Sequence, residues 1–309
     1  MKFIKIIIFT GVISAIGAFG YSAMKKTGFQ MPLTAKDAST AQKIIKSAPI
    51  NKQSAITQIS QLQTTPKKPS YLPNITDSQI PKGFAREQLS SYFGQIKIYS
   101  VSYSSSETTP SEIKINSDFQ DKNKSIDISG WKIKSNLREL EIPKAINIYE
   151  PSGSSQETDI YFESGNNLNI YSNISPIGKN FRLNKCIGYL ENSYKFTPPL
   201  SSNCPPIYTR DEIATFAGYC QTYIMSIGSC KLPDTNYYNS LPGTDQGNAC
   251  RNFLNPISYN GCFQKHRNDS DFLSKEFRTW VNQNTLLDSQ HDRLLLFDKN
   301  GFLVSEYVY

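Results

Sequence analysis

Several short motifs that indicate a well-known chemistry are absent from this 309-residue sequence. It contains no phosphate-binding loop of the form G-x-x-x-x-G-K-[ST], no zinc-protease H-E-x-x-H and no nucleophile elbow G-x-S-x-G. Histidine occurs only twice, as His266 and His291, and cysteine does not occur before Cys186. The sequence therefore offers no motif for nucleotide binding, zinc proteolysis or serine hydrolysis of these types, and only two histidines for acid–base chemistry.

Acidic residues are nearly absent from the amino-terminal part of the chain. Residues 1–83 contain eleven lysines but only Asp37 and Asp77 as acids, so the formal net charge of +7 comes from this part and the remainder is slightly acidic. A nucleic-acid-binding domain carries a basic patch of its own, so we expect no nucleic-acid partner. We interpret the lysine-rich part as a solvated, self-repelling linker, and contact with anionic lipids or wall polymers is the alternative.

The chain opens with an apolar run, residues 6–24, that has lysines on both sides. A bilayer core is crossed by about 20 apolar residues, so we expect residues 1–26 to be a membrane anchor or signal segment. An uncleaved anchor is favoured, because Lys25 and Lys26 end the run abruptly. A signal segment cleaved after the poor site Ala18-Phe19-Gly20 is the second possibility. A buried helix of a cytosolic protein is the third.

All the cysteines lie in the carboxy-terminal part of the chain, and their number is even. Downstream of an export segment, such a set predicts disulfides formed in an oxidising compartment. Zinc is an alternative, since Cys262 and His266 have C-x3-H spacing, but no C-x-x-C pair accompanies them. Six cysteines allow fifteen pairings, so the connectivity stays open. The expected disulfide residues are Cys186, Cys204, Cys220, Cys230, Cys250 and Cys262.

These features predict a single-pass cell-membrane protein with an extracytoplasmic carboxy-terminal body, or a secreted one if the first segment is cleaved. Residues 27–92 are predicted to be a flexible basic linker, and residues 93–309 a β-rich domain. From residue 95 on, apolar and polar residues alternate, which predicts short strands and a sandwich. The expected strands cover residues 96–103, 113–115, 126–133, 140–143, 159–162, 168–171, 180–183, 293–297 and 302–309.

Two local patterns predict turns and helices within this domain. Asn300-Gly301 between alternating runs predicts a hairpin with positive φ at both residues, although residues 298–301 also begin like a calcium loop. Between 199 and 290 the pattern indicates a cysteine-rich helical insertion. Thr209 and Glu212 form a capping box, followed by a helical apolar face that contains Cys220 and ends at Gly228. A second helix is predicted over residues 271–283, with Phe272, Leu273, Phe277 and Trp280 facing inward.

Several of these segments together resemble the lamin tail domain, in the form found in bacterial membrane-anchored surface proteins. The strand 112–116 is similar to that family's E-x-I-x-I/L-x-N strand, and residues 126–133 to its segment around Gly130 and Trp131. Residues 140–143 resemble the strand that follows. Residues 292–307, with Asn300 and Gly301, resemble its closing hairpin, and residues 181–190 a motif of its bacterial surface versions. The resemblance implies an immunoglobulin-like β-sandwich, which here carries a long insertion outside the family's usual pattern.

The resemblance also implies a binding or structural module, since no catalytic residue set belongs to this domain. We therefore expect a non-enzymatic interaction or envelope-structural protein, with a protein or cell-envelope partner and no metal, small-molecule cofactor or catalytic residue. An accessory domain acting through a membrane partner is a variant of this function. The alternative is an exported hydrolase in which His266 or His291 works with nearby carboxylates of the insertion, such as Asp269 and Asp271.

Overall fold

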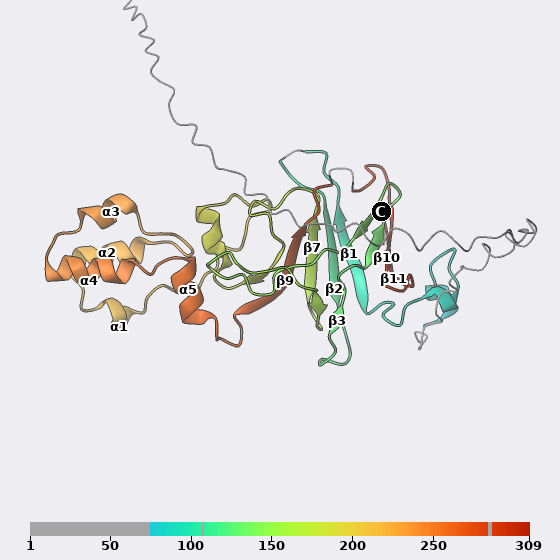
Figure 1. Ribbon diagram of the computed structural model, residues 1–309, viewed down its shortest axis with the longest axis horizontal. Coiled ribbons are helices and arrows are strands. Elements are labelled where there is room, and N and C mark those ends of the chain that lie inside the picture. The colour runs from blue at the N-terminus through green and yellow to red at the C-terminus, as the bar shows by residue number, and fades with distance from the viewer. Residues whose placement is uncertain (1–74, 107, 284–285) are drawn as a thin grey trace, which may run out of the picture. The chain divides into compact units, whose positions relative to one another are not determined.

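The computed structural model describes residues 75–106, 108–283 and 286–309 (Figure 1). These residues belong to one compact unit, Thr64–Tyr309. The predicted anchor, residues 1–26, and most of the predicted linker lie outside the described residues. Within the part that is described, no helix is both long and apolar enough to cross a membrane.

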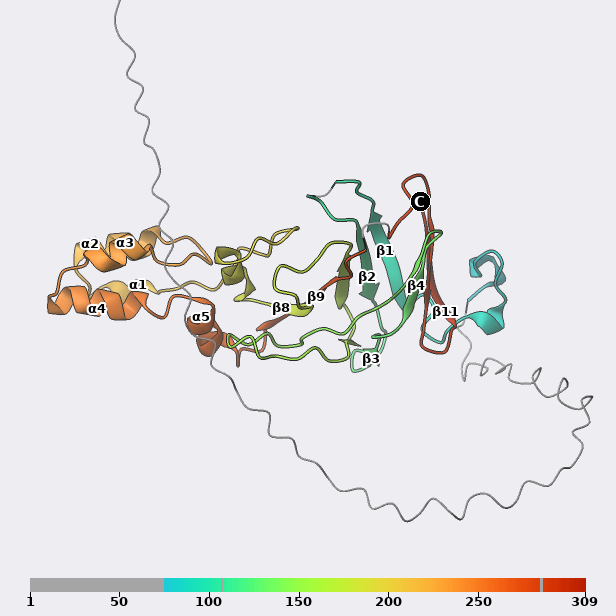
Figure 2. The same ribbon diagram turned by 45° about the horizontal axis from the view of Figure 1, so that its top comes forward.

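Two sheets account for most of the β structure (Figures 1 and 2). The larger sheet has the strand order β1-β2-β7-β9-β8, and all its neighbours are antiparallel except β7 and β9. Its strands are β1 (Ile96–Ser102), β2 (Glu112–Ser117), β7 (Asn167–Tyr171), β9 (Leu273–Trp280) and β8 (Phe181–Asn184). The smaller sheet has the order β11-β10-β4-β5, from β11 (Leu303–Val308), β10 (Arg293–Phe297), β4 (Lys132–Lys134) and β5 (Glu139–Glu141). Strands β3 (Ile126–Asp127) and β6 (Tyr161–Phe162) pair separately.

The strands form where the sequence alternates, because successive side chains of a strand point to opposite faces. In β2 every second residue is buried, and β10 shows the same period. Buried residues from every strand of both sheets except β8 meet in one hydrophobic core. Trp131 lies in that core at 2% exposure and stacks on Tyr92, with ring centroids 5.8 Å apart. Gly130 has φ of +75° and its N–H donates to the carbonyl of Ile142, so the predicted strand 126–133 is interrupted there and becomes β3 and β4.

The closing hairpin lies where Asn300-Gly301 predicts it, but its turn is of another type. Only Gly301 has positive φ, at +81°, so the prediction of positive φ at Asn300 is wrong. The reason is Asp298, whose Oδ1 accepts hydrogen bonds from the N–H groups of Asn300 (2.9 Å) and Phe302 (3.1 Å). The register shifts by one between Leu296 and Phe297, as in loops where a left-handed glycine forms a bulge. The Asp298 carboxylate is buried and satisfied by protein groups, which favours the turn over a calcium loop.

The helix predicted over residues 271–283 is wrong, because residues 273–280 form strand β9. This strand lies between β7 and β8, and its last four residues are all buried. Phe277 belongs to the core between the sheets, whereas Trp280 belongs to a second core. A strand covered on both faces loses its polar alternation, and the apolar residues left over happened to have helical spacing.

Five α-helices lie within residues 210–266: α1 (Arg210–Ile213), α2 (Gly218–Ser226), α3 (Thr235–Ser240), α4 (Asp245–Leu254) and α5 (Tyr259–His266). The described residues also form short 3-10 helices, labelled η1 (Asp77–Gln79), η2 (Arg86–Gln88) and η3 (Ile187–Asn192). We call residues 204–266 the helical segment. Its α1–α4 lie beyond the edge strand β8 and cover no face of either sheet (Figures 1 and 2). The second core joins this segment to the end of the larger sheet.

Local capping explains where these helices begin. The predicted box is present, since Glu212 N–H donates to Thr209 Oγ1 and Thr209 N–H donates to Glu212 Oε2. The capping box starts α1, which ends at Ile213, and α2 begins at Gly218. Cys220 in α2 is buried, as predicted. Two further helices share a pattern that was not predicted. A proline is followed two residues later by a Thr or Ser cap, and a glycine lies three residues after the cap. The pattern is Pro242, Thr244 and Gly247 in α4, and Pro256, Ser258 and Gly261 in α5.

Candidate functional site

All six cysteines form disulfides, which confirms the predicted framework. The pairs are Cys186–Cys262, Cys204–Cys230 and Cys220–Cys250, with Cα atoms 5.8, 5.3 and 6.0 Å apart. Such Cα separations suit a disulfide. A sulfur in a disulfide is neither a free thiolate nor an available metal ligand, so the pairing speaks against zinc and against a thiol nucleophile. Among the described residues, no group of three or more His, Cys, Asp or Glu side chains is arranged to hold a metal ion.

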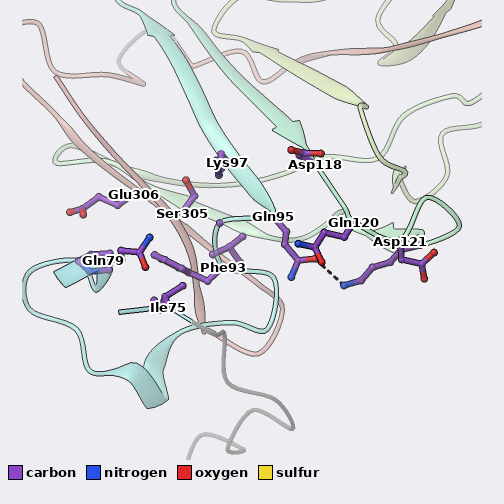
Figure 3. A pocket seen from close by; sticks show the side chains of 14 residues that line it. Ile75, Gln79, Phe93, Gln95, Lys97, Asp118, Gln120, Asp121, Ser305 and Glu306 are labelled. Atoms are coloured by element: carbon purple, nitrogen blue, oxygen red, sulfur yellow. Dashed lines mark hydrogen bonds between the residues drawn. The ribbon is translucent and has the colours of Figure 1, made fainter. Parts of the chain in front are cut away.

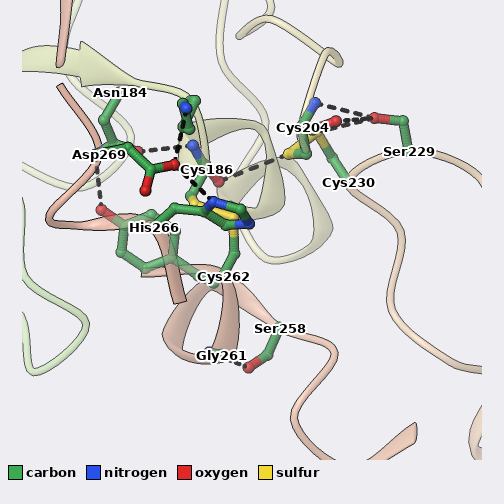
Figure 4. Close-up of a disulfide and its surroundings, with 12 residues drawn as sticks. Asn184, Cys186, Cys204, Ser229, Cys230, Ser258, Gly261, Cys262, His266 and Asp269 are labelled. Carbon is green, nitrogen blue, oxygen red and sulfur yellow. Dashed lines mark hydrogen bonds and ion pairs between the residues drawn. A yellow bond between two sulfur atoms is a disulfide. The ribbon is translucent and has the colours of Figure 1, made fainter. Parts of the chain in front are cut away.

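The crosslinks all act on the helical segment and its attachment. Cys204–Cys230 and Cys220–Cys250 close loops inside it, and Cys186–Cys262 ties α5 to the chain just after β8 (Figure 4). No disulfide joins the two sheets. The crosslinked region is closely packed. A Cβ on Gly188 would lie 2.5 Å from Cys230 Sγ and 2.2 Å from the Ser201 carbonyl oxygen, so only glycine fits there.

Polar contacts hold α5 against the sheet next to the Cys186–Cys262 bond. Asn184 Nδ2 donates to the Tyr259 hydroxyl (3.0 Å), and this hydroxyl donates to the Tyr149 carbonyl oxygen (2.5 Å). The Asn184 side-chain oxygen accepts from the N–H of Cys186. Burial raises the pKa of Tyr259 above its usual range, so its phenol stays neutral and keeps donating its proton.

His266, at the end of α5, is part of a charged cluster. Its Nδ1 lies 2.8 Å from Asp269 Oδ2 (Figure 4). The Lys185 ammonium lies 3.1 Å from the same oxygen and 2.5 Å from Asp271 Oδ1. Hydrogen bonds from His266 and then Lys185 hold the pKa of Asp269 below its usual value, and Lys185 lowers the pKa of Asp271. The sequence suggested the His266–Asp269 contact. It did not suggest Lys185, which lies 84 positions before Asp269.

The structure does not bring His291 into this cluster. His291 is exposed, and its carbonyl oxygen accepts a hydrogen bond from Asn136 Nδ2 next to the smaller sheet. The neighbouring Asp292 is fully buried, and its carboxylate accepts from the N–H groups of Asn136, Asp288 and Arg293. The two histidines share no contact, so a site that uses both is not formed.

A groove of about 290 Å³ runs beside His266 in the helical segment. Prolines and apolar side chains make up much of its lining, and its charged and polar side chains are those of Tyr189, Glu212, Asn252, Ser258, Lys265 and His266. The Ser258 hydroxyl caps α5 by accepting from Gly261 N–H (3.2 Å) (Figure 4). The apolar lining residues are Pro205, Pro206, Ile207, Phe253, Pro256 and Ile257.

A larger hollow, of about 1060 Å³, lies at the beginning of β1 (Figure 3). It is lined by residues of η1, β1 and β11 and by the loop after β2. Several of its polar groups already have protein partners. Gln95 accepts from Lys124 Nζ (3.3 Å), and Glu306 accepts from Arg293 Nε (2.6 Å). Sequence reasoning missed this hollow, because its lining comes from four separate stretches without a common motif.

Comparison with known protein families, with curated proteins and with solved structures finds no match to this chain.

Proposed function

We propose that this chain is a non-enzymatic binding module of the cell envelope. Residues 1–26 would anchor it in the cell membrane, or direct its secretion if they are cleaved, and the body would lie outside the cytoplasm. Its sheets would form a lamin-tail-like, immunoglobulin-like sandwich that carries the helical segment, and that segment would contact a protein or cell-envelope partner.

The three disulfides support the extracytoplasmic location. Disulfides persist in oxidising compartments and are rare in the cytosol, where thiols are kept reduced. The apolar run at residues 6–24 supplies the export signal that such a location requires.

Three features support the lamin-tail assignment. Trp131 is at the centre of a core shared by two sheets, Gly130 has the positive φ that the following bend requires, and Gly301 closes the final hairpin. The helical segment, inserted between β8 and β9, departs from the family's usual pattern. Because a fold does not define a function, this insertion is the part on which we base the binding role.

The single observation that carries the binding role is where the crosslinks lie. The two sheets share a core of their own without a disulfide, whereas all three disulfides stabilise the helical segment or its attachment. That segment also exposes large apolar side chains on a stretch with little charge: Tyr219 at 43%, Met225 at 55% and Leu232 at 44% exposure. Interfaces are enriched in tyrosine and methionine and depleted of charge at their centre.

A surface-variant experiment tests this proposal. The full-length chain in phosphatidylcholine nanodiscs is sedimented with host cells or wall material, and a triple variant Tyr219→Ser, Met225→Ser, Leu232→Ser is compared with wild type. Binding should fall with this variant. A matched triple variant of exposed apolar residues on the sheet part, Tyr99→Ser, Leu137→Ser and Tyr161→Ser, should bind normally. The opposite result would move the binding surface to the sheets and refute the role of the helical segment.

The hydrolase remains a second candidate because of one observation, the 2.8 Å contact between His266 Nδ1 and Asp269 beside the groove. A carboxylate that orients a histidine leaves the other ring nitrogen available as a general base. Ester and peptide substrates incubated with wild type and His266→Gln test it. Turnover that is lost in His266→Gln would favour the hydrolase, and absence of turnover in wild type would favour the binding module.

A further inference from the structure

The groove beside His266 has one wall that a disulfide holds in place. This wall consists of Pro205, Pro206 and Ile207, and it directly follows Cys204, which is bonded to Cys230. Proline fixes φ near −65°, so two consecutive prolines leave the backbone little freedom. The wall is therefore shaped before any ligand arrives.

A second part of the lining is held in the same way. Pro256 and Ile257 lie just before α5, and Cys262 in α5 is bonded to Cys186 next to β8. Gly261 keeps α5 in direct contact with this wall, since a Cβ there would lie 1.7 Å from the Pro256 carbonyl oxygen. Two fixed walls make a preformed groove, and a ligand that fits it loses little affinity to ordering of the protein.

The volume and lining define the apolar part of a ligand. A volume of about 290 Å³ corresponds to roughly ten waters at about 30 Å³ each, which is the space of one or two side chains. A whole globular surface does not enter a groove of this size, whereas a side chain of an extended peptide does. Prolines and Ile207 give water in the groove few hydrogen-bond partners. Displacement of that water by an apolar side chain is therefore favourable.

The charges at the end of α5 define the polar part of the ligand. Lys265 and His266 line the groove. His266 is paired with Asp269, whereas Lys265 has only a 3.8 Å contact with Glu212. Glu212 is engaged by Thr209, whose N–H donates to Oε2 at 2.6 Å. One cation, Lys265, thus lies beside an apolar groove without a close ion pair, and a carboxylate complements it.

We infer that this groove binds an extended segment of a partner protein that carries an apolar side chain next to an acidic one. The apolar side chain lies against Ile207 and Ile257, and the carboxylate pairs with Lys265. This inference rests on the proposed binding role of the helical segment and names the chemistry of its partner.

Fluorescence anisotropy with short labelled peptides tests the inference, using the full-length chain in phosphatidylcholine nanodiscs. The probes are peptides with a central Leu-Asp pair, with Gly-Asp and Leu-Asn versions as comparisons, and laurate is the lipid competitor. The protein variants are Lys265→Glu and, separately, Ile207→Ser. The matched control is Lys195→Glu, an exposed lysine outside the groove whose replacement changes the net charge equally. Thermal melts of each variant show whether the fold is retained.

The Leu-Asp peptide should bind wild type and the control equally. It should lose about tenfold or more in affinity with either groove variant, because Lys265→Glu removes a charge-assisted hydrogen bond and Ile207→Ser removes the apolar contact. Equal binding to wild type and both groove variants would overturn the inference, as would laurate binding in place of every peptide. If no peptide binds while cells or wall material still bind through Tyr219, Met225 and Leu232, the groove inference fails and the proposed function stands. If neither binds, both fail.

Discussion

Removal of the Cys186–Cys262 disulfide should cause the largest loss of stability of any single crosslink in this chain. This bond closes a loop of 76 residues. The loop-entropy relation gives about 4.5 kcal/mol at 25 °C for a loop of that length. The other two disulfides lie inside the loop and shorten it, which lowers the figure to about 4 kcal/mol. Alanine is the suitable replacement, because Cys186 is fully buried and a serine hydroxyl would need a partner there.

The two tryptophans of the chain make the measurement specific. Trp131 lies in the core between the sheets and Trp280 in the core that joins the helical segment to β8 and β9. In a Trp131→Phe background, the fluorescence of Trp280 therefore reports the unfolding of the second core. Urea unfolding gives the free energy for this background with and without the double replacement Cys186→Ala, Cys262→Ala, and the value should fall by about 4 kcal/mol.

The Cys220–Cys250 pair supplies the matched comparison. Its loop of 30 residues gives about 3.6 kcal/mol by the same relation, so replacing this pair by alanine should destabilise the protein less. A decrease of under about 1 kcal/mol for Cys186–Cys262, or a smaller decrease than for Cys220–Cys250, would refute the loop-closure reasoning.

Three further changes have definite expected outcomes. Gly188→Ala should destabilise by about 1–3 kcal/mol, because its Cβ would overlap Cys230 Sγ and the Ser201 carbonyl oxygen; Gly218→Ala, where a Cβ meets nothing within 4 Å, should have little effect in the same urea assay. Asp298→Ala should cost about 3 kcal/mol, since it leaves the Ser90 hydroxyl and two backbone N–H groups without their acceptor; an unchanged unfolding midpoint would contradict the role given to this carboxylate. The Lys185 cluster should make stability depend on pH. The pKa values of Asp269 and Asp271 are lowered in the folded state, so their contribution is present above the unfolded-state pKa of about 4 and is lost as the pH falls through the folded-state values. Unfolding measured from pH 6 to pH 2 should show this loss in wild type and a weaker one in Lys185→Met, and identical profiles would contradict it.

Local sequence signals predicted the elements whose neighbours are near in the chain. Alternation located the strands around Ile113 and Leu296, and the capping box located the start of α1. The proline and the Thr or Ser cap that precede Gly247 and Gly261 are a further local signal, and they mark the starts of α4 and α5. The position of the final hairpin was predictable, but its turn type depended on one side chain, Asp298, that accepts two backbone hydrogen bonds.

Features that depend on distant parts of the chain could not be predicted. Strand β9 had no visible alternation, because it lies between β7 and β8 and is buried on both faces at its end. The disulfide pairing could not be predicted, because it depends on which loops the fold brings together. At the candidate site, His266 and Asp269 are three positions apart and could be connected from sequence, whereas Lys185 reaches them only through the pairing of β8 with β9. The groove depends in turn on two crosslinks whose partners were open.

The position of β9 has a consequence for how the chain assembles. Strands β1, β2, β7 and β8 are synthesised first, but the place between β7 and β8 stays empty until β9 arrives; Arg182 and Ser274, which become hydrogen-bonded neighbours, are 92 positions apart. Until then β7 and β8 each present an unpaired edge, which is the kind of surface that seeds aggregation. Oxidation of Cys186 with Cys262 brings the chain just before β9 to the chain just after β8 and reduces the entropy lost in that search. Refolding of the reduced chain should therefore be slow and prone to precipitate, and an oxidising buffer should accelerate the late step in which the sheet is completed.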